Sequence, residues 1–181
     1  MGLMEKLFFR NWPQPHTSGV LLDLTLELSA GALGQFSING SAEKLKKMLG
    51  APANWSRWKY RRQWHYPELG VWFNTSKEGI LEGINLVVRE EALYPTCPGW
   101  TVRWKPWSGS IRFENGDRIP ALAAKKEDFI KLVGEPDERD DDPENPEFMY
   151  SDSPRFKDFG FDVDFTPKGE LSALEIYSMR D

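Results

Sequence analysis

The sequence has few of the residues from which catalytic and metal sites are usually built. It has one cysteine, Cys97, and two histidines, His16 and His65, and no Gly-rich segment opens a helix as a phosphate-binding loop does. The spacing of these residues predicts no nucleophilic triad. These absences argue against an enzyme, and we predict no catalytic residue and no cofactor.

A single cysteine also excludes an internal disulfide, which is typical of a protein in a reducing compartment. No apolar run reaches the roughly 18 residues of a membrane-spanning helix. The N-terminus has no long apolar segment and no small-residue cleavage site, and Lys6 stands where a myristoylation motif needs Ser or Thr. We therefore expect a cytoplasmic protein with no membrane contact.

Aromatic residues are abundant, with eight Trp and eleven Phe among 181 residues. Such side chains bury large areas, and they are favoured both in tight cores and at recognition surfaces. The formal net charge of −5 argues against nucleic acid as the main partner. Composition therefore favours a globular protein with an aromatic core or an aromatic binding face.

The chain contains an internal repeat, in which residues 69–87 align with residues 159–177 without a gap. The alignment matches glycines and apolar residues at five positions: Gly70 with Gly160, Gly79 with Gly169, Leu81 with Leu171, Ile84 with Leu174, and Leu86 with Ile176. Alternating apolar residues on both sides of a glycine turn predict a β-hairpin in each copy.

Alternation extends to the segments before each hairpin. Leucines alternate with polar residues over 22–28, and apolar alternation returns over 35–39. The second half repeats this order over 100–104 and 110–115. Period-two alternation predicts strands with one buried face in all four segments.

A short amphipathic helix is expected between these strands and the hairpin in each half. Each helix ends in a glycine followed two residues later by a proline, in Leu49-Gly50-Ala51-Pro52 and Val133-Gly134-Glu135-Pro136. Glycine and proline in these positions stop a helix. The expected unit is therefore strand, strand, helix, strand, strand.

We predict an α+β fold made of two tandem ββαββ repeats, with antiparallel sheets and one short helix in each repeat. The expected divisions are an N-terminal extension (1–19), a first repeat (20–90), a linker (91–99) and a second repeat (100–181) that contains an acidic insert (135–147). One repeat alone buries only about 60% of its unfolded surface, so the two should share a sheet or pack face to face.

The acidic insert is predicted to be a solvated loop because of its composition. Calcium loops need a turn-forming glycine and alternating ligands, whereas this insert has consecutive carboxylates interrupted by proline. We therefore predict no metal site in it.

The helix corners, each followed by an aromatic strand and a hairpin, resemble the tandem repeats of β-lactamase inhibitory proteins and of small outer-membrane assembly lipoproteins. The resemblance spans most of both halves. It implies short helices packed on antiparallel sheets and a role in protein binding. This chain departs from those exported families in its single cysteine and in the absence of a signal. No functional residue carries over.

Residues 58–66 interleave aromatic and basic side chains. Trp, Tyr and Arg dominate interface hot spots, so this segment is the predicted protein-binding strand. The same pattern fits a core strand with buried aromatics, or a strand that binds single-stranded nucleic acid. In a strand, one face would carry Trp58, Tyr60, Arg62, Trp64 and Tyr66. The predicted binding residues are these five and Arg61.

The predicted function is a non-enzymatic protein-binding module, and its specific form would be a cytoplasmic inhibitor or immunity-type partner of a bacterial toxin or effector. One alternative is single-stranded nucleic-acid binding through residues 57–66. A second is an enzyme of unknown class, which would need a pocket joining His65 to the acidic residues of the second half.

Overall fold

The computed structural model describes residues 25–57, 61–89, 104–151, 156 and 158–180, and their core lies between two β-sheets. The fold is α+β, as predicted, with two short helices and mostly strands. The N-terminal extension, the linker, and the predicted binding residues Trp58 and Tyr60 lie outside the described residues.

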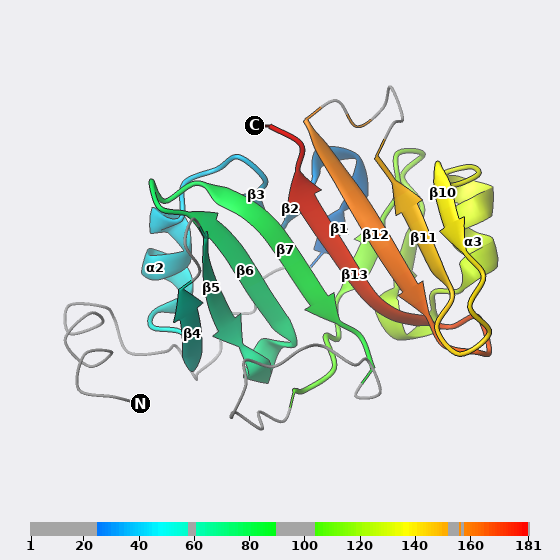
Figure 1. Cartoon of the computed structure of the whole chain (residues 1–181), viewed down its shortest axis with the longest axis horizontal. Coiled ribbons are helices and arrows are strands. Elements are labelled where there is room, and N and C mark those ends of the chain that lie inside the picture. The colour runs from blue at the N-terminus through cyan, green and yellow to red at the C-terminus, as the bar shows by residue number, and fades with distance from the viewer. Residues whose placement is uncertain (1–24, 58–60, 90–103, 152–155, 157, 181) are drawn as a thin grey trace.

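The large sheet has eight antiparallel strands in the order β10-β11-β12-β13-β7-β6-β5-β4 (Figure 1). Its centre is the pairing of β7 with β13, so strands from both halves of the chain form one continuous sheet. The strands are β4 (Asn54–Arg57), β5 (Arg61–Tyr66), β6 (Val71–Ser76), β7 (Leu81–Val87), β10 (Glu138–Asp140), β11 (Glu147–Tyr150), β12 (Phe159–Phe165) and β13 (Leu171–Ser178).

The small sheet also joins the two halves, because β1 pairs in parallel with β8. Its order is β3-β2-β1-β8-β9. The strands are β1 (Thr25–Glu27), β2 (Ala32–Leu33), β3 (Phe36–Ser37), β8 (Ser110–Arg112) and β9 (Arg118–Pro120).

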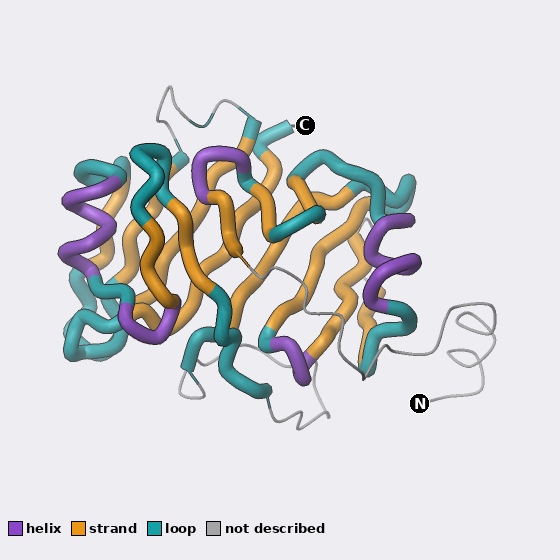
Figure 2. The backbone as a smooth tube through the Cα atoms, turned by 180° about the vertical axis from the view of Figure 1, so that it is seen from behind, coloured by secondary structure: helices purple, strands orange, loops and turns teal. Residues whose placement is uncertain are grey.

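Two helices flank the small sheet on one face of the large sheet (Figure 2). They are α2 (Glu43–Leu49) and α3 (Lys126–Leu132), and the short 3-10 turns are η1 (Leu28–Ala30), η2 (Pro67–Leu69) and η3 (Ala121–Ala123). Apolar side chains from these elements and from the large sheet form one buried cluster. Within the described part of the chain, no helix has the length and apolar content needed to cross a membrane.

The opposite face of the large sheet carries the alternate set of side chains, and we call it the open face. Figure 1 is viewed onto it, and among the described residues no helix and no strand of the small sheet lies over it. The strand alternation explains the division: Phe161, Val163 and Phe165 are buried on the core side, whereas Asp162 and Asp164 lie on the open side.

The two predicted hairpins are structural copies of each other. Gly79 and Gly169 turn them with φ of 82° and 75°, the left-handed region that favours glycine. In each turn a hydroxyl, from Ser76 or Thr166, accepts hydrogen bonds from two backbone N–H groups of the same turn. The start of each helix is bonded to the glycine carbonyl of its own hairpin, at 2.9 Å in the first half and 2.8 Å in the second.

The helix corners are also duplicated. The Tyr66 hydroxyl donates to the Gly50 carbonyl at 3.0 Å, and the Tyr150 hydroxyl donates to the Gly134 carbonyl at 3.2 Å. The spacing is 16 residues in both cases. Burial raises the pKa of both hydroxyls, so they remain protonated donors. A tyrosine at the end of the second strand after each helix, β5 or β11, therefore anchors the end of that helix.

We expect Tyr66→Phe to lower the free energy of unfolding by about 1 kcal/mol or more, because it leaves the buried Gly50 carbonyl without its donor. Tyr150→Phe is the matched comparison and should cost less, since its hydrogen bond is only partly buried. Urea unfolding of the two variants measures both values. Equal losses would contradict the expected role of burial.

Three parts of the chain differ from the sequence prediction. Residues 138–140 of the acidic insert form the edge strand β10 instead of a loop, because their backbone pairs with β11 while their charged side chains stay exposed. Charges on an edge strand also discourage pairing with other chains. The segment between the strand predicted over 110–115 and the second helix contains β9 and η3, where the sequence predicted no element. Trp104, predicted in a strand, belongs to no described strand.

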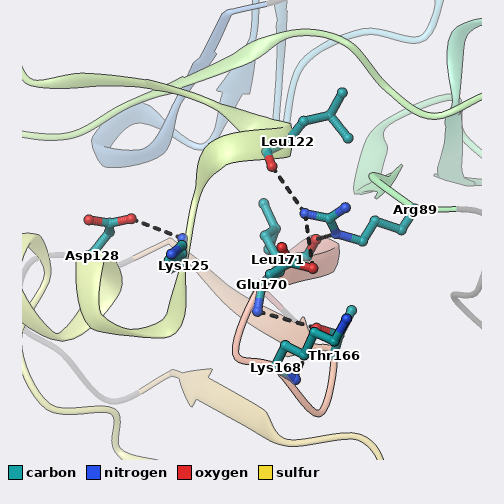
Figure 3. A network of polar contacts seen from close by, with 8 residues as sticks. All are labelled: Arg89, Leu122, Lys125, Asp128, Thr166, Lys168, Glu170 and Leu171. Atoms are coloured by element: carbon teal, nitrogen blue, oxygen red, sulfur yellow. Dashed lines mark hydrogen bonds and ion pairs between the residues drawn. The ribbon is translucent and has the colours of Figure 1, made fainter.

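Arg89, just after β7, ties the first half to the second (Figure 3). Its Nε donates to the Leu171 carbonyl at 3.1 Å and its Nη2 to the Leu122 carbonyl at 3.0 Å. Its guanidinium also lies 3.5 Å from the Glu170 carboxylate. One side chain thus joins the end of β7 to η3 and to the start of β13.

Candidate functional site

One row of cross-strand partners crosses the open face from β10 to β5. Its character changes along the way, from acidic side chains on β10, β12 and β13 through an amide on β7 to aromatic rings on β6 and β5. The partners in sequence are Glu138, Met149, Asp162, Glu175, Asn85, Trp72 and His65.

The aromatic end of the row is a cluster of three rings. Trp104 lies against both Trp72 and His65, with ring centroids 5.4 Å and 5.7 Å apart. Burial lowers the pKa of His65, so its imidazole is neutral at physiological pH. Trp72 and His65 are buried, whereas Trp104 remains half-buried at the surface of the cluster.

Asn85 links the aromatic end to the acidic end. With its amide oriented to satisfy its neighbours, the oxygen accepts from Trp72 Nε1 at 3.0 Å and from Asn74 Nδ2 at 3.2 Å. The amide nitrogen then lies 3.1 Å and 3.2 Å from the two oxygens of Glu175. This hydrogen-bonded chain holds the Trp72 ring and the Glu175 carboxylate in fixed positions.

Asp162 and Tyr177 form the centre of the acidic end. The Tyr177 hydroxyl donates to Asp162 Oδ1 at 3.1 Å. The neighbouring strand provides room for the ring: a Cβ on Gly160 would lie 2.8 Å from Tyr177 ring atoms. Burial raises the pKa of Asp162 to about 6, with further upward contributions from Glu147 and other carboxylates.

Carboxylates face each other directly across strands on this face. Asp162 is the Cα partner of Glu175, and Glu147 is the partner of both Asp140 and Asp164. Like charges directly opposite each other destabilise a sheet. Burial and the Asp140 charge accordingly raise the pKa of Glu147. This arrangement therefore reduces the stability of the fold, as is common at functional sites.

The carboxylates lie in one layer and do not converge on a point. Among the residues that the structure describes, no group of three His, Cys, Asp or Glu could hold a metal ion. The chemistry offered by this face is a pattern of negative charge, amide groups and aromatic rings.

The predicted binding residues of the 58–66 segment mostly lie on the other side of the sheet. Trp64 and Tyr66 are 5% and 6% exposed and belong to the core under α2, so they are not available to a partner. Arg62 is half-buried and lines a polar pocket of about 280 Å³ with Lys46 and Lys77. Arg61 is the first residue of β5, two positions before Gln63 and four before His65.

The sequence predicts only part of the set of residues that lie on the open face. Alternation places Asp162 and Asp164 on one face of a strand, but it does not reveal that Trp72 and Trp104 meet on the same side of the sheet. Trp104 reaches His65 from a segment 39 positions further along the chain, a contact that only the tertiary structure creates.

Raising the pH from about 4 to about 6 is expected to destabilise the fold through Asp162. In this window the folded state keeps a proton that the unfolded state, with an Asp pKa of 3.8, has released. In the Asp162→Asn variant, the free energy of unfolding should therefore fall less between these two pH values. It should also be higher at pH 7 than in the unmodified protein. The groups that face Asp162 are Tyr177, Glu138, Glu147, Asp164 and Glu175.

Urea unfolding at several pH values measures this effect. The asparagine keeps an oxygen that can accept from the Tyr177 hydroxyl, so the change removes the charge and leaves the hydrogen bond. A pH profile identical to that of the unmodified protein would contradict the role assigned to Asp162.

Comparison with known proteins adds little to this description. No family model matches the chain, and no curated protein matches it. A solved structure, the DUF4309 family protein YjgB from Bacillus subtilis subsp. subtilis str. 168, is similar at 10% sequence identity with a TM-score of 0.46, covering 81% of this chain and 84% of that chain. At this TM-score the similarity carries no argument. The resemblance to β-lactamase inhibitory proteins and assembly lipoproteins is not confirmed by these comparisons.

Proposed function

We propose that this protein is a non-enzymatic module that binds another protein through the open face of its large sheet. The observation that carries the proposal is the set of carboxylates placed opposite one another across β10 to β13. Such pairs oppose folding, so their retention in this fold is best explained by a contact with a partner.

The open face also has the composition of an interface. Aromatic side chains and hydrogen-bonding groups are enriched at the centres of protein interfaces, and here Trp72, Asn85 and Glu175 are held in place by one another. Side chains fixed before binding lose less conformational entropy when the partner arrives. The face is therefore suited to a stable complex.

The specific form that we propose is a cytoplasmic inhibitor or immunity-type partner of a bacterial toxin or effector. Such a protein acts by stoichiometric binding and needs no catalytic group. The single cysteine of the chain fits a reducing compartment.

A pull-down with the full chain as bait tests the proposal. The open-face variant is Trp104→Ala with Glu175→Gln. The matched control, Leu122→Ala with Glu43→Gln, makes the same two kinds of change at exposed positions on η3 and α2. Mass spectrometry identifies the retained proteins, and circular dichroism verifies the fold of each bait.

A stoichiometric protein retained by the unmodified and control baits, and lost with the open-face variant, would support the proposal. A partner retained equally by all three baits would place the interface elsewhere. An eluate that contains nucleic acid and no specific protein would favour the alternative, single-stranded nucleic-acid binding through residues 57–66.

A further inference from the structure

The open side of β10 to β13 carries only one sign of charge. Among the described residues of these strands, no Lys or Arg lies on that side. Arg139 of β10 faces the other way, with its guanidinium 5.1 Å from the centroid of the core residue Phe148. The carboxylates on the open side are Glu138, Asp140, Glu147, Asp162, Asp164 and Glu175.

These carboxylates are spaced so that one cation can interact with two of them. Adjacent strands lie about 4.8 Å apart, and side chains of one face recur about every 6.7 Å along a strand. An ammonium or guanidinium group placed between β11 and β12 would contact both Glu147 and Asp164, which are direct cross-strand partners. A cation there would turn their mutual repulsion into attraction.

A buried polar atom beside this region also lacks a partner. Asn74 is 8% exposed, and its side chain lies over Gly83, the cross-strand partner of Tyr177. Its Oδ1 finds no hydrogen-bond donor among the described residues. This oxygen is itself covered by neighbouring atoms, so a partner would contact the carboxylates and Trp104 around it and not the oxygen.

The aromatic end suits the same kind of partner. Trp104 is half-buried at the surface of the ring cluster. The faces of Trp rings attract Lys and Arg cations that come within about 6 Å of the ring centroid. The long side chains of Lys and Arg also pack their methylene groups on apolar surfaces.

We infer that the partner presents a basic segment with several Lys or Arg side chains, which lies across the open face from β10 to β6. This inference rests on the proposed function and names the chemistry of the partner. Charge complementarity selects this occupant, since the six carboxylates would repel an acidic segment or a nucleic-acid backbone.

A peptide of ten lysines is a direct probe, and a peptide of ten glutamates is the comparison. Calorimetry or fluorescence anisotropy at low salt should detect binding of the lysine peptide alone, and added salt should weaken that binding. The triple variant Glu147→Gln/Asp162→Asn/Asp164→Asn is expected to weaken binding about tenfold, because three ion pairs with the peptide are lost.

A second triple variant controls for net charge. Glu43→Gln/Glu78→Gln/Glu114→Gln changes the charge by the same amount at exposed positions on α2 and at two turns away from the open face. It should bind the lysine peptide as the unmodified protein does. Equal weakening by both triple variants would overturn the inference, because binding would then follow total charge.

A measurement on the unmodified protein does not depend on whether any variant folds. In an NMR titration, the lysine peptide should shift the indole N–H signal of Trp104 and leave that of the fully buried Trp107 in place. Absence of binding, or binding of a single-stranded oligonucleotide in place of the peptide, would also overturn the inference. If the pull-down partner still requires Trp104 and Glu175 in that case, only the basic chemistry of the partner is wrong and the proposed function stands.

Discussion

Gly70→Ala is expected to lower the free energy of unfolding by about 2–5 kcal/mol. Gly70 has φ of 67°, which costs an L-residue about 1–2 kcal/mol. A Cβ at this position would also lie 2.5 Å from the Lys105 carbonyl oxygen and from the Trp107 backbone nitrogen. Overpacking of this kind typically costs about 1–3 kcal/mol, and backbone atoms cannot move aside as a flexible side chain does.

Gly79→Ala separates these two contributions. Gly79 also has a positive φ, of 82°, but a Cβ there meets nothing within 4 Å. We expect it to cost only the backbone term of about 1–2 kcal/mol. Denaturant unfolding of the two variants measures the difference. Equal losses in the free energy of unfolding would show that residues 105–107 move away from the added Cβ at little energetic cost.

Trp107→Ala should cost about 3–5 kcal/mol, the range for removing a large core side chain. Trp107 is fully buried, and its backbone N–H donates to the Val87 carbonyl at 2.7 Å. Its indole Nε1 finds no hydrogen-bond partner among the described residues. Trp107→Phe should therefore cost much less, since it keeps most of the apolar volume and removes a buried unsatisfied donor.

Thermal and denaturant unfolding of the two variants test this prediction. A Trp107→Phe variant as unstable as Trp107→Ala would indicate that the indole nitrogen is hydrogen-bonded in solution. A small effect of Trp107→Ala would mean that this part of the core collapses into the vacated space.

Gly70 and Trp107 also connect the stability of the fold to the proposed interface. The segment over 104–107 passes the start of β6, where it contacts Gly70, and places Trp104 on the open face and Trp107 in the core. Disturbing Gly70 should therefore displace Trp104 as well as weaken the core. The affinity for the lysine peptide is then expected to fall in the Gly70→Ala variant, even where it remains folded.

The local elements of this protein follow from its sequence. Gly79 and Gly169 mark the two hairpin turns because left-handed backbone favours glycine, and both turns form where the repeat predicts them. The Gly-x-Pro corners end both helices, and alternation identifies β12 residue by residue, whereas a register shift opposite Asp164 and Phe165 interrupts the alternation of β13. All of these features depend on residues close to one another in the chain.

The tertiary structure decided which side of each strand is covered. Alternation divides β5 into two faces, and the aromatic content of one of them fits a binding surface as well as a core. The packing of α2 and the small sheet on that side buried Trp64 and Tyr66, and left His65 to meet Trp72 and Trp104 on the other. The pairing of β7 with β13 likewise depends on contacts about 90 residues apart, which no local pattern specifies.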